Sequence, residues 1–197
     1  MSDKATLDWY AANAPRFAYS SAQSPSRHLD AFLEQLSPGA RILELGCGTG
    51  RDAARMVERG FDVDPTDAVA GMAAKANARH KVGARVMRFE ELDAKGEYDA
   101  VWAHASLLHV ARAKLPEILR SIRRSLRQGG WHYASYKLGS GEGRDLLGRL
   151  HNFPDPSWLR GSYVASGFAL ADEVVWRGDG TDGTLRDWMA VTVRKLG

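Results

Sequence analysis

Glycines cluster in one short stretch of the sequence, Glu44-Leu45-Gly46-Cys47-Gly48-Thr49-Gly50. Glycines in a turn permit positive φ and let a bulky ligand lie against bare backbone. A helix that begins directly after such a turn offers free N–H groups and a partial positive charge to a ligand carboxylate or phosphate. Glycine clusters also occur in turns for purely structural reasons, so this stretch alone leaves both a ligand site and a plain turn open.

A carboxylate follows the first glycine of this turn, Gly46, by 21 residues, at Asp67. It lies at the end of the second strand that the sequence predicts. A carboxylate in that place can accept hydrogen bonds from both ribose hydroxyls of a nucleoside. The alternative is that Asp67 caps the helix that follows, since Asp is a favoured N-cap residue.

The third glycine position separates two classes of nucleotide ligand. A dinucleotide fingerprint requires Gly or Ala at position 51, where helix and strand pack closely, and this chain has Arg51. An acidic residue, Glu44, instead stands two positions before the first glycine. A carboxylate there suits a ligand with a positive charge, such as the ammonium or sulfonium of S-adenosylmethionine. A nicotinamide-dependent oxidoreductase is therefore disfavoured but stays open.

The elements that position these residues alternate between strand and helix, the pattern of a parallel sheet covered by helices. The glycine stretch is a strand-to-helix turn. Near the C-terminus two strands flank a Gly/Asp-rich connection too short for a helix, which predicts an antiparallel hairpin. Strands are predicted over 41–45, 61–66, 85–89, 98–103, 131–137, 168–176 and 188–195, and helices over 29–36, 51–60, 69–78, 115–126 and 157–166.

Length and composition indicate one domain. A chain of 197 residues with 44% hydrophobic content can bury one sizeable core. One cysteine, Cys47, excludes an intramolecular disulfide and leaves no cysteine set for zinc, so we expect no metal. No stretch approaches eighteen apolar residues and the N-terminus has no apolar signal region, which predicts a cytoplasmic protein without a membrane partner.

The net charge of +3 would suit an anionic partner. The densest basic cluster falls on the polar face of a predicted helix, where charges are usually solvated, and no aromatic residues are interleaved with it. Nucleic acid is therefore not an expected partner. The cluster comprises Arg120, Arg123, Arg124 and Arg127.

The sequence resembles the class I S-adenosylmethionine-dependent methyltransferases over nearly its whole length. ILELGCGTGRDA resembles their glycine-rich motif, and VDPTDAVAGM, MRFEELDA and YDAVWAHASLLHV resemble the next three. The turn LRQGGW and the reversed strand of the terminal hairpin are also similar. The resemblance implies a Rossmann-like three-layer αβα sandwich with a seven-stranded, mostly parallel sheet and an antiparallel C-terminal hairpin strand.

The same resemblance implies cofactor contacts for S-adenosylmethionine. Asp67 would hold the ribose, while Phe89 by its backbone and Glu90 by its side chain would contact adenine. The family usually has an acidic residue where this chain has Arg88, so the resemblance implies no cofactor contact for that position. The methionine part would lie against Glu44, Gly46, Cys47, Gly48, Gly50, Ala103 and His104.

More narrowly, the chain is similar to bacterial small-molecule methyltransferases named by analogy to tellurite-resistance proteins. DWYAANAPRFA resembles their cofactor-covering segment, here residues 1–27, ahead of a core over 28–197. Tyr10 and Asn13 lie three residues apart, so one helical turn would present Tyr10 to the cofactor and Asn13 to the acceptor. An ordinary helix face with a buried Tyr is an equally open interpretation.

SYKLGSGEGRD resembles a loop that follows the fifth strand in some of these enzymes. Lys137 and Arg144 would favour an acceptor with an oxyanion, and the glycines over 139–143 would let the loop close as a lid. A surface loop with solvated charges is the alternative.

The predicted function is transfer of a methyl group from S-adenosylmethionine to a small-molecule acceptor. A base is needed only if the acceptor holds a proton, and His104, His109 and Tyr136 are the candidates, with His132 nearby. His109 sits in an apolar run, so a hydrogen-bonded core role stays open. A non-catalytic S-adenosylmethionine-binding protein is the alternative function. Neither the acceptor nor the oligomeric state follows from the sequence.

Overall fold

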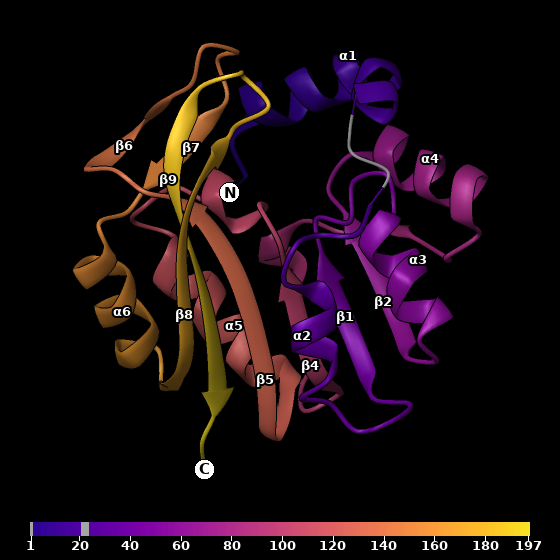
Figure 1. Cartoon of the computed structure of the whole chain (residues 1–197), viewed down its shortest axis with the longest axis vertical. Coiled ribbons are helices and arrows are strands. Elements are labelled where there is room, and N and C mark those ends of the chain that lie inside the picture. The colour runs from indigo at the N-terminus through magenta and orange to yellow at the C-terminus, as the bar shows by residue number, and fades with distance from the viewer. Residues whose placement is uncertain (1, 21–23) are drawn as a thin grey trace.

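The computed structural model describes residues 2–20 and 24–197, with side chains described for 2–14 and 24–197. A seven-stranded sheet in the order β3-β2-β1-β4-β5-β9-β8 forms the centre of the molecule (Figure 1). Its strands are β1 (Arg41–Leu45), β2 (Asp62–Asp67), β3 (Arg85–Val86), β4 (Tyr98–Ala103), β5 (Leu126–Lys137), β8 (Phe168–Asp179) and β9 (Leu185–Lys195).

The first five strands pair in parallel, and β9 lies antiparallel between β5 and β8. The connection from β8 to β9 spans residues 180–184, too short for the helical crossover that a parallel neighbour requires. The predicted fold, a mostly parallel sheet with an antiparallel C-terminal hairpin, is confirmed.

Helices cover both faces of the sheet because its central strands are buried on both sides. On β1, Ile42 joins a core cluster with Phe32 of α2 (Leu29–Leu33) and Met56 of α3 (Arg51–Glu58). The next residue, Leu43, points to the other face and shares a cluster with Leu119 of α5 (Leu115–Ser125). The helices α6 (Pro156–Ala165) and α4 (Ala70–His80) complete the outer layers.

Several predicted element boundaries were wrong, and two of them have a local cause. The strand predicted over 85–89 ends at Val86, and a 3-10 turn, η1 (Phe89–Glu91), follows because the Glu91 carboxylate accepts a hydrogen bond from the Arg88 N–H. The helix predicted to reach Leu126 ends at Ser125. Strand β5 begins at Leu126 rather than at Trp131. Both errors arise where backbone pairing or a local cap overrides hydrophobic periodicity.

Two elements lie over the carboxyl edge of the sheet. Helix α1 (Lys4–Ser20) runs across that edge towards α4, beside the small antiparallel hairpin of β6 (Gly141–Arg144) and β7 (Leu150–Phe153) (Figure 1). The segment predicted as a loop over 139–144 is therefore largely the first strand of a hairpin. A second 3-10 turn, η2 (Leu107–His109), follows β4 and contacts β7.

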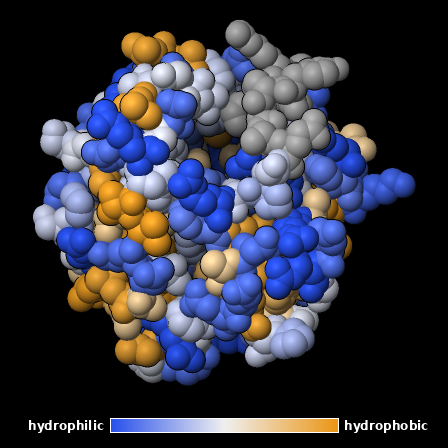
Figure 2. Space-filling model, in the orientation of Figure 1, coloured by the Kyte–Doolittle hydropathy of each residue, from blue (hydrophilic) through white to orange (hydrophobic). Residues whose placement is uncertain are grey.

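The surface carries mixed side chains. Figure 2 shows several separate apolar patches on the side of α6 and β8, interrupted by hydrophilic groups. Exposed residues of that side include Val164 and Val175. Within the described part of the chain, no helix combines the length and apolar character needed to cross a membrane.

Candidate functional site

The candidate site lies where the chain reverses its direction of travel across the sheet. From β1 the strands proceed outward to β2 and β3, whereas β4 lies on the other side of β1 and leads to β5. Ligands of open α/β sheets bind in the crevice outside the carboxyl ends of strands at such a switch point. A cavity of about 850 Å³ opens there, within the usual range for small-molecule sites.

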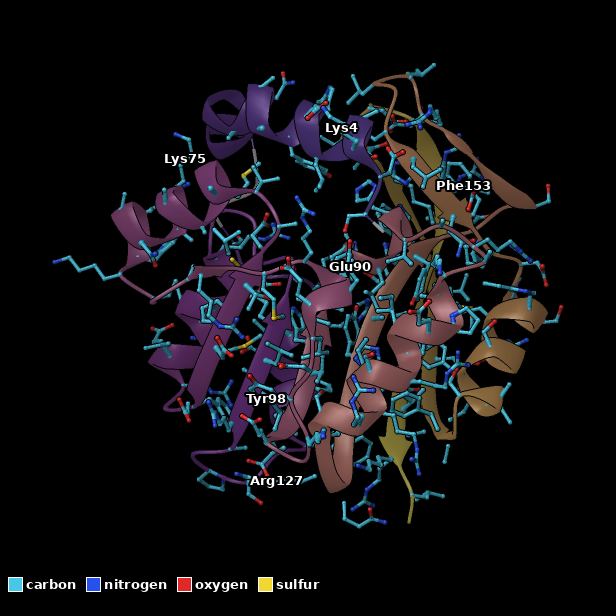
Figure 3. All side chains as sticks on the ribbon, turned by 180° about the vertical axis from the view of Figure 1, so that it is seen from behind. Lys4, Lys75, Glu90, Tyr98, Arg127 and Phe153 are labelled. Carbon is cyan, nitrogen blue, oxygen red and sulfur yellow. The ribbon has the colours of Figure 1, made fainter. Side chains whose placement is uncertain are left out.

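Several elements contribute to this cavity. The glycine turn, the carboxyl ends of β2 and β4, helix α1, the turn at Phe89 and the β8–β9 connection all line it. In Figure 3 Glu90 lies at this edge of the sheet, below the helix that carries Lys4, while Tyr98 and Arg127 mark the opposite edge. The site is thus assembled from segments that are far apart in the sequence.

The three glycines of the turn share a positive φ but differ in what surrounds them. All three have positive φ, +81° at Gly46, +55° at Gly48 and +80° at Gly50. A Cβ at Gly46 would stand 2.6 Å from Cβ of Ser106, and one at Gly50 would stand 2.8 Å from Cβ of Ala76. A Cβ at Gly48 would meet no atom within 4 Å. Gly46 and Gly50 therefore permit close packing, and Gly48 leaves bare backbone beside the cavity.

The carboxylate of Glu44 is buried in the wall of the cavity. Its side chain is 4% exposed, and Oε2 has no hydrogen-bond partner among the described residues. Burial, together with the charges of Asp52 and Asp67, raises the pKa of Glu44 well above its usual value. A ligand cation beside Oε2 would supply the missing partner, because a buried carboxylate needs a charge or hydrogen bonds to stay ionised.

A second carboxylate, Asp52, lines the same cavity and was missed by sequence reasoning. It accepts hydrogen bonds from the Ser26 N–H at 2.8 Å and from Nε1 of Trp102 at 3.0 Å. An acidic residue in the first turn of a helix is an ordinary partner of the helix dipole, so the sequence offered no signal for a role in the cavity. Only the packing of α3 against β4 brings Asp52 to Trp102.

Asp67 lines the cavity and braces the glycine turn. Its Oδ2 accepts from the Gly48 N–H at 2.9 Å, and its Oδ1 accepts from the Val69 N–H at 2.8 Å. The N-cap of α4 is Val69, so Asp67 is not the helix cap that was the alternative interpretation. Burial raises the pKa of Asp67 to about 6. Each carboxylate oxygen keeps lone-pair capacity for a ligand hydroxyl.

The residues expected at adenine, Phe89 and Glu90, also line the cavity. The Glu90 carboxylate accepts hydrogen bonds from the backbone N–H and the hydroxyl of Ser2, each at 2.8 Å. The N-terminal segment is therefore tied to this side of the site. Of the other expected cofactor contacts, Cys47 and His104 line the cavity, whereas Gly50 and Ala103 lie behind its wall.

The candidate bases differ in position. His104 and His109 line the cavity, and burial lowers the pKa of His104 to about 4 and that of His109 to about 3. Tyr136 lies in the core, where its hydroxyl is 2.9 Å from that of Tyr163, and His132 contacts the same Tyr163 hydroxyl at 3.2 Å. Two histidines, both neutral at pH 7, therefore face the cavity, and the other two candidates do not.

His109 connects the cavity wall to helix α1. Its Nδ1 lies 2.7 Å from the carbonyl oxygen of Leu150 and must donate to it, so Nε2 accepts from the Tyr10 hydroxyl at 3.0 Å. Tyr10 also accepts from Nη1 of Arg149 at 2.8 Å. Asn13 donates to the Trp9 carbonyl and does not line the cavity.

The two residues expected at an acceptor oxyanion are separated in the structure. Arg144 is half-exposed and bonds Asp3 at 2.9 Å and the Gly148 carbonyl at 2.7 Å. Lys137 is buried, with its Nζ 3.5 Å from Oδ1 of Asp182. Neither residue is itself part of the cavity lining.

A buried ionic cluster lies behind His109 and was also missed. The Asp145 carboxylate accepts from Arg149 at 2.6 Å and from Nε2 of His151 at 3.1 Å. Burial alone would raise the pKa of Asp145, but the hydrogen bonds from Arg149 lower it to about 2. These residues follow a glycine-rich stretch that resembles a surface loop, so nothing local indicated their burial.

Comparisons with known proteins agree with the geometry. Residues 42–130 match the protein family described as methyltransferase domain. A trans-aconitate 2-methyltransferase from Deinococcus radiodurans is 30% identical over 109 residues, which make up 54% of this chain and 41% of that enzyme. The chain thus matches less than half of that relative's length.

Solved structures share the fold. The 1,6-didemethyltoxoflavin-N1-methyltransferase of Burkholderia thailandensis, crystallised with S-adenosylhomocysteine, superposes with a TM-score of 0.75 and 22% identity over 95% of this chain and 84% of that one. The [4+2]-cyclase SpnF superposes with a TM-score of 0.76 and 19% identity over 96% of this chain and 95% of the cyclase.

The matched segment contains β1 to β4 and hence the glycine turn, Asp67, Glu90 and His104. The cavity and the sequence match therefore concern the same residues. On these grounds residues 42–130 are similar to a methyltransferase domain, and the chain shares the fold of solved S-adenosylmethionine-dependent methyltransferases.

Proposed function

We propose that this protein binds S-adenosylmethionine in the cavity at the switch point and transfers its methyl group to a small-molecule acceptor. The observation that carries the proposal is the unpaired Oε2 of Glu44, buried beside the glycine turn together with Asp52 and Asp67. Two buried carboxylates, together with the partly buried Asp67, favour a cationic ligand over an anionic one. S-adenosylmethionine carries an ammonium and a sulfonium, whereas a dinucleotide carries phosphates.

The residues of the cavity fit this cofactor. Glu44 and the N–H groups at the start of α3 would hold the amino-acid part, and Asp67 would accept from the ribose hydroxyls. Phe89 and Glu90 would flank the adenine. When bound, the cofactor supplies an activated methyl group, so the chain's task is to orient the acceptor and exclude water.

Water exclusion is assigned to helix α1 and its contacts. Ser2, Asp3, Thr6, Leu7 and Tyr10 line the cavity, and the segment is tied down by Glu90, Arg144 and Arg149. A covered cavity of this size suits a small acceptor. The enzymes that resemble this chain act on small molecules by their names, which supports the same class here. We also propose that the chain is related to the small-molecule methyltransferases named by analogy to tellurite-resistance proteins.

Acid–base chemistry at the acceptor is assigned to neutral histidine. His104 is the stronger candidate because its hydrogen bonds involve Nδ1 alone, which lies 3.3 Å from the hydroxyls of Tyr133 and Ser135. In His109 the Nε2 lone pair already accepts a hydrogen bond from Tyr10. A neutral imidazole with a free nitrogen can accept a proton from an acceptor N–H or O–H.

A second candidate function is cofactor binding without methyl transfer, favoured by the [4+2]-cyclase with the same fold. Isothermal titration with S-adenosylmethionine, S-adenosylhomocysteine and NAD tests the first step. We expect binding of the first two and none of NAD. A methyl-release assay on a panel of metabolites then separates the two candidates, because a binding protein would release no methyl group to any acceptor.

A further inference from the structure

A lysine ammonium is buried against the β8–β9 connection, whose backbone lines the cavity. Lys137, the last residue of β5, is 2% exposed, and its Nζ has no hydrogen-bond partner among the described residues. Burial lowers the pKa of Lys137 below its usual value. An ammonium removed from water is costly unless it is paired and hydrogen-bonded, and this one is incompletely satisfied.

The ion-pair partner of Lys137 comes from the β8–β9 connection. Oδ1 of Asp182 lies 3.5 Å from Nζ, beyond ordinary hydrogen-bond length, and the Asp182 side chain is 1% exposed. Four neighbours of Asp182, namely Asp179, Gly180, Thr181 and Gly183, line the cavity. A Cβ on Gly180 would collide with both Nζ and Oδ1. Bare backbone that faces the cavity thus lies directly against the ion pair.

The charges around Lys137 balance only while Asp182 is in place. Asp145 is already bonded to Arg149 and His151. His151 and His109 are neutral, because burial lowers their pKa values to about 4 and about 3, with the charge of Lys137 contributing. Two cations therefore face two carboxylates. If Asp182 withdrew, one positive charge would be left beside the cavity.

We propose that Lys137 recognises a carboxylate of the acceptor, and that Asp182 occupies the place of that carboxylate in the ligand-free protein. This inference rests on the proposed function and names its substrate class. One uncompensated positive charge matches a carboxylate better than a phosphate dianion. The connection over 180–184, with Gly180 and Gly183, would move outward as the acceptor's carboxylate replaces Asp182 on Nζ.

The test uses acetate, succinate and benzoate, each paired with its amide, titrated into protein loaded with S-adenosylhomocysteine. Asp182→Asn removes the carboxylate that competes for Lys137. We therefore expect at least one acid to bind this variant at least fivefold more tightly than it binds the parent. The double variant Lys137→Met/Asp182→Asn should lose that binding. Amides should bind equally, or equally poorly, to all three proteins.

A matched control has the same net charge as the double variant. Lys195→Met/Asp182→Asn removes a lysine at the far end of β9, where Nζ donates to the Leu126 carbonyl, and it should keep the gain. The inference is overturned if Asp182→Asn shows no gain for any acid, if the gain survives Lys137→Met, or if amides gain equally.

Cofactor binding is measured separately by titrating S-adenosylhomocysteine into every variant. If S-adenosylhomocysteine fails to bind the parent, the proposed cofactor is wrong. The comparison of acids with amides on the unloaded protein still tests whether Lys137 binds a carboxylate. The double variant leaves no buried charge without its partner, so a folding defect of Lys137→Met alone does not decide the outcome.

Discussion

The carboxylates of Glu44, Asp52 and Asp67 line one cavity, and the charges of Asp52 and Asp67 add to the effect of burial in raising the pKa of Glu44. In the ligand-free protein, burial raises the pKa of Asp67 from 3.8 to about 6. Because the folded pKa lies above the unfolded value, the stability that Asp67 contributes is present below pH 4 and is lost as pH rises through 6. A bound cation reverses this effect by favouring the ionised form.

Binding of S-adenosylmethionine should therefore tighten as pH rises from 5 to 7.5, and Asp67→Asn should flatten the part of this dependence centred near pH 6. The variant should also bind more weakly at pH 7.5, by about 1.5–3 kcal/mol, because a charge-assisted hydrogen bond to ribose is lost. Isothermal titration at several pH values measures both effects. An unchanged slope and affinity would show that Asp67 only braces the turn.

Gly48 offers a second test, since a Cβ there would enter open space beside the cavity. Gly48→Val should abolish binding of S-adenosylmethionine. Gly39→Val is the matched control, because Gly39 also has positive φ and open space around it but lies away from the cavity.

Both substitutions impose left-handed strain of roughly 1–2 kcal/mol, so urea denaturation should show similar losses of stability. Titration with the cofactor should separate them. Equal binding of the cofactor by both variants would show that the glycine turn is not part of the cofactor site.

Helix α1 is held over the cavity by polar contacts at its start and middle. The ion pair of Arg144 with Asp3 joins it to strand β6 at 2.9 Å, and the exposed pair of Arg160 with Glu173 has a similar length of 2.8 Å. Exposed pairs of this kind contribute little stability by themselves. The two pairs differ in position, because Asp3 lines the cavity and Glu173 does not.

Arg144→Ala should accordingly raise the dissociation rate of S-adenosylmethionine several-fold, measured by stopped-flow fluorescence, while Arg160→Ala leaves it unchanged. Each variant should lose less than about 1 kcal/mol of unfolding free energy. A dissociation rate equal to that of the parent in both variants would mean that the pair does not help to close the site.

The hairpin of β6 and β7 depends on a buried ion pair. Arg149→Met should lower the free energy of unfolding by about 3–5 kcal/mol, because Asp145 would remain charged and buried without its partner. The double variant Asp145→Asn/Arg149→Met should recover part of that loss. Urea denaturation of the three proteins gives the comparison, and a single variant as stable as the parent would show that the pair is not needed.

At the level of the whole chain, cofactor binding should stabilise the fold by mass action. S-adenosylmethionine at about 100 times its dissociation constant adds about 2.7 kcal/mol. For a chain of this size that corresponds to a rise in Tm of roughly 5–10 °C, at about 2–4 °C per kcal/mol. Scanning fluorimetry measures the shift, and NAD at the same concentration should produce none. A shift with NAD alone would revive the oxidoreductase alternative.

Much of the fold was predictable because its information is local. Strands β1 and β4 begin and end at the predicted residues, since short apolar runs between turn signals specify buried parallel strands. The glycine turn and Asp67 were found by the same local reasoning. The order of the sheet then brings the carboxyl ends of β1, β2 and β4 to one edge, so most of the expected cofactor residues meet there.

What only the tertiary structure decided depends on contacts between distant segments. Hydrophobic periodicity carries no information about which carboxylate faces a cavity, and Asp52 does so only because α3 packs on β4. A glycine-rich stretch resembles a loop until β7 pairs with it, as it does for Arg144. Likewise, Lys137 meets Asp182 only because β9 runs back beside β5. Buried charges of this kind are placed by the global fold, and local sequence pattern does not encode their partners.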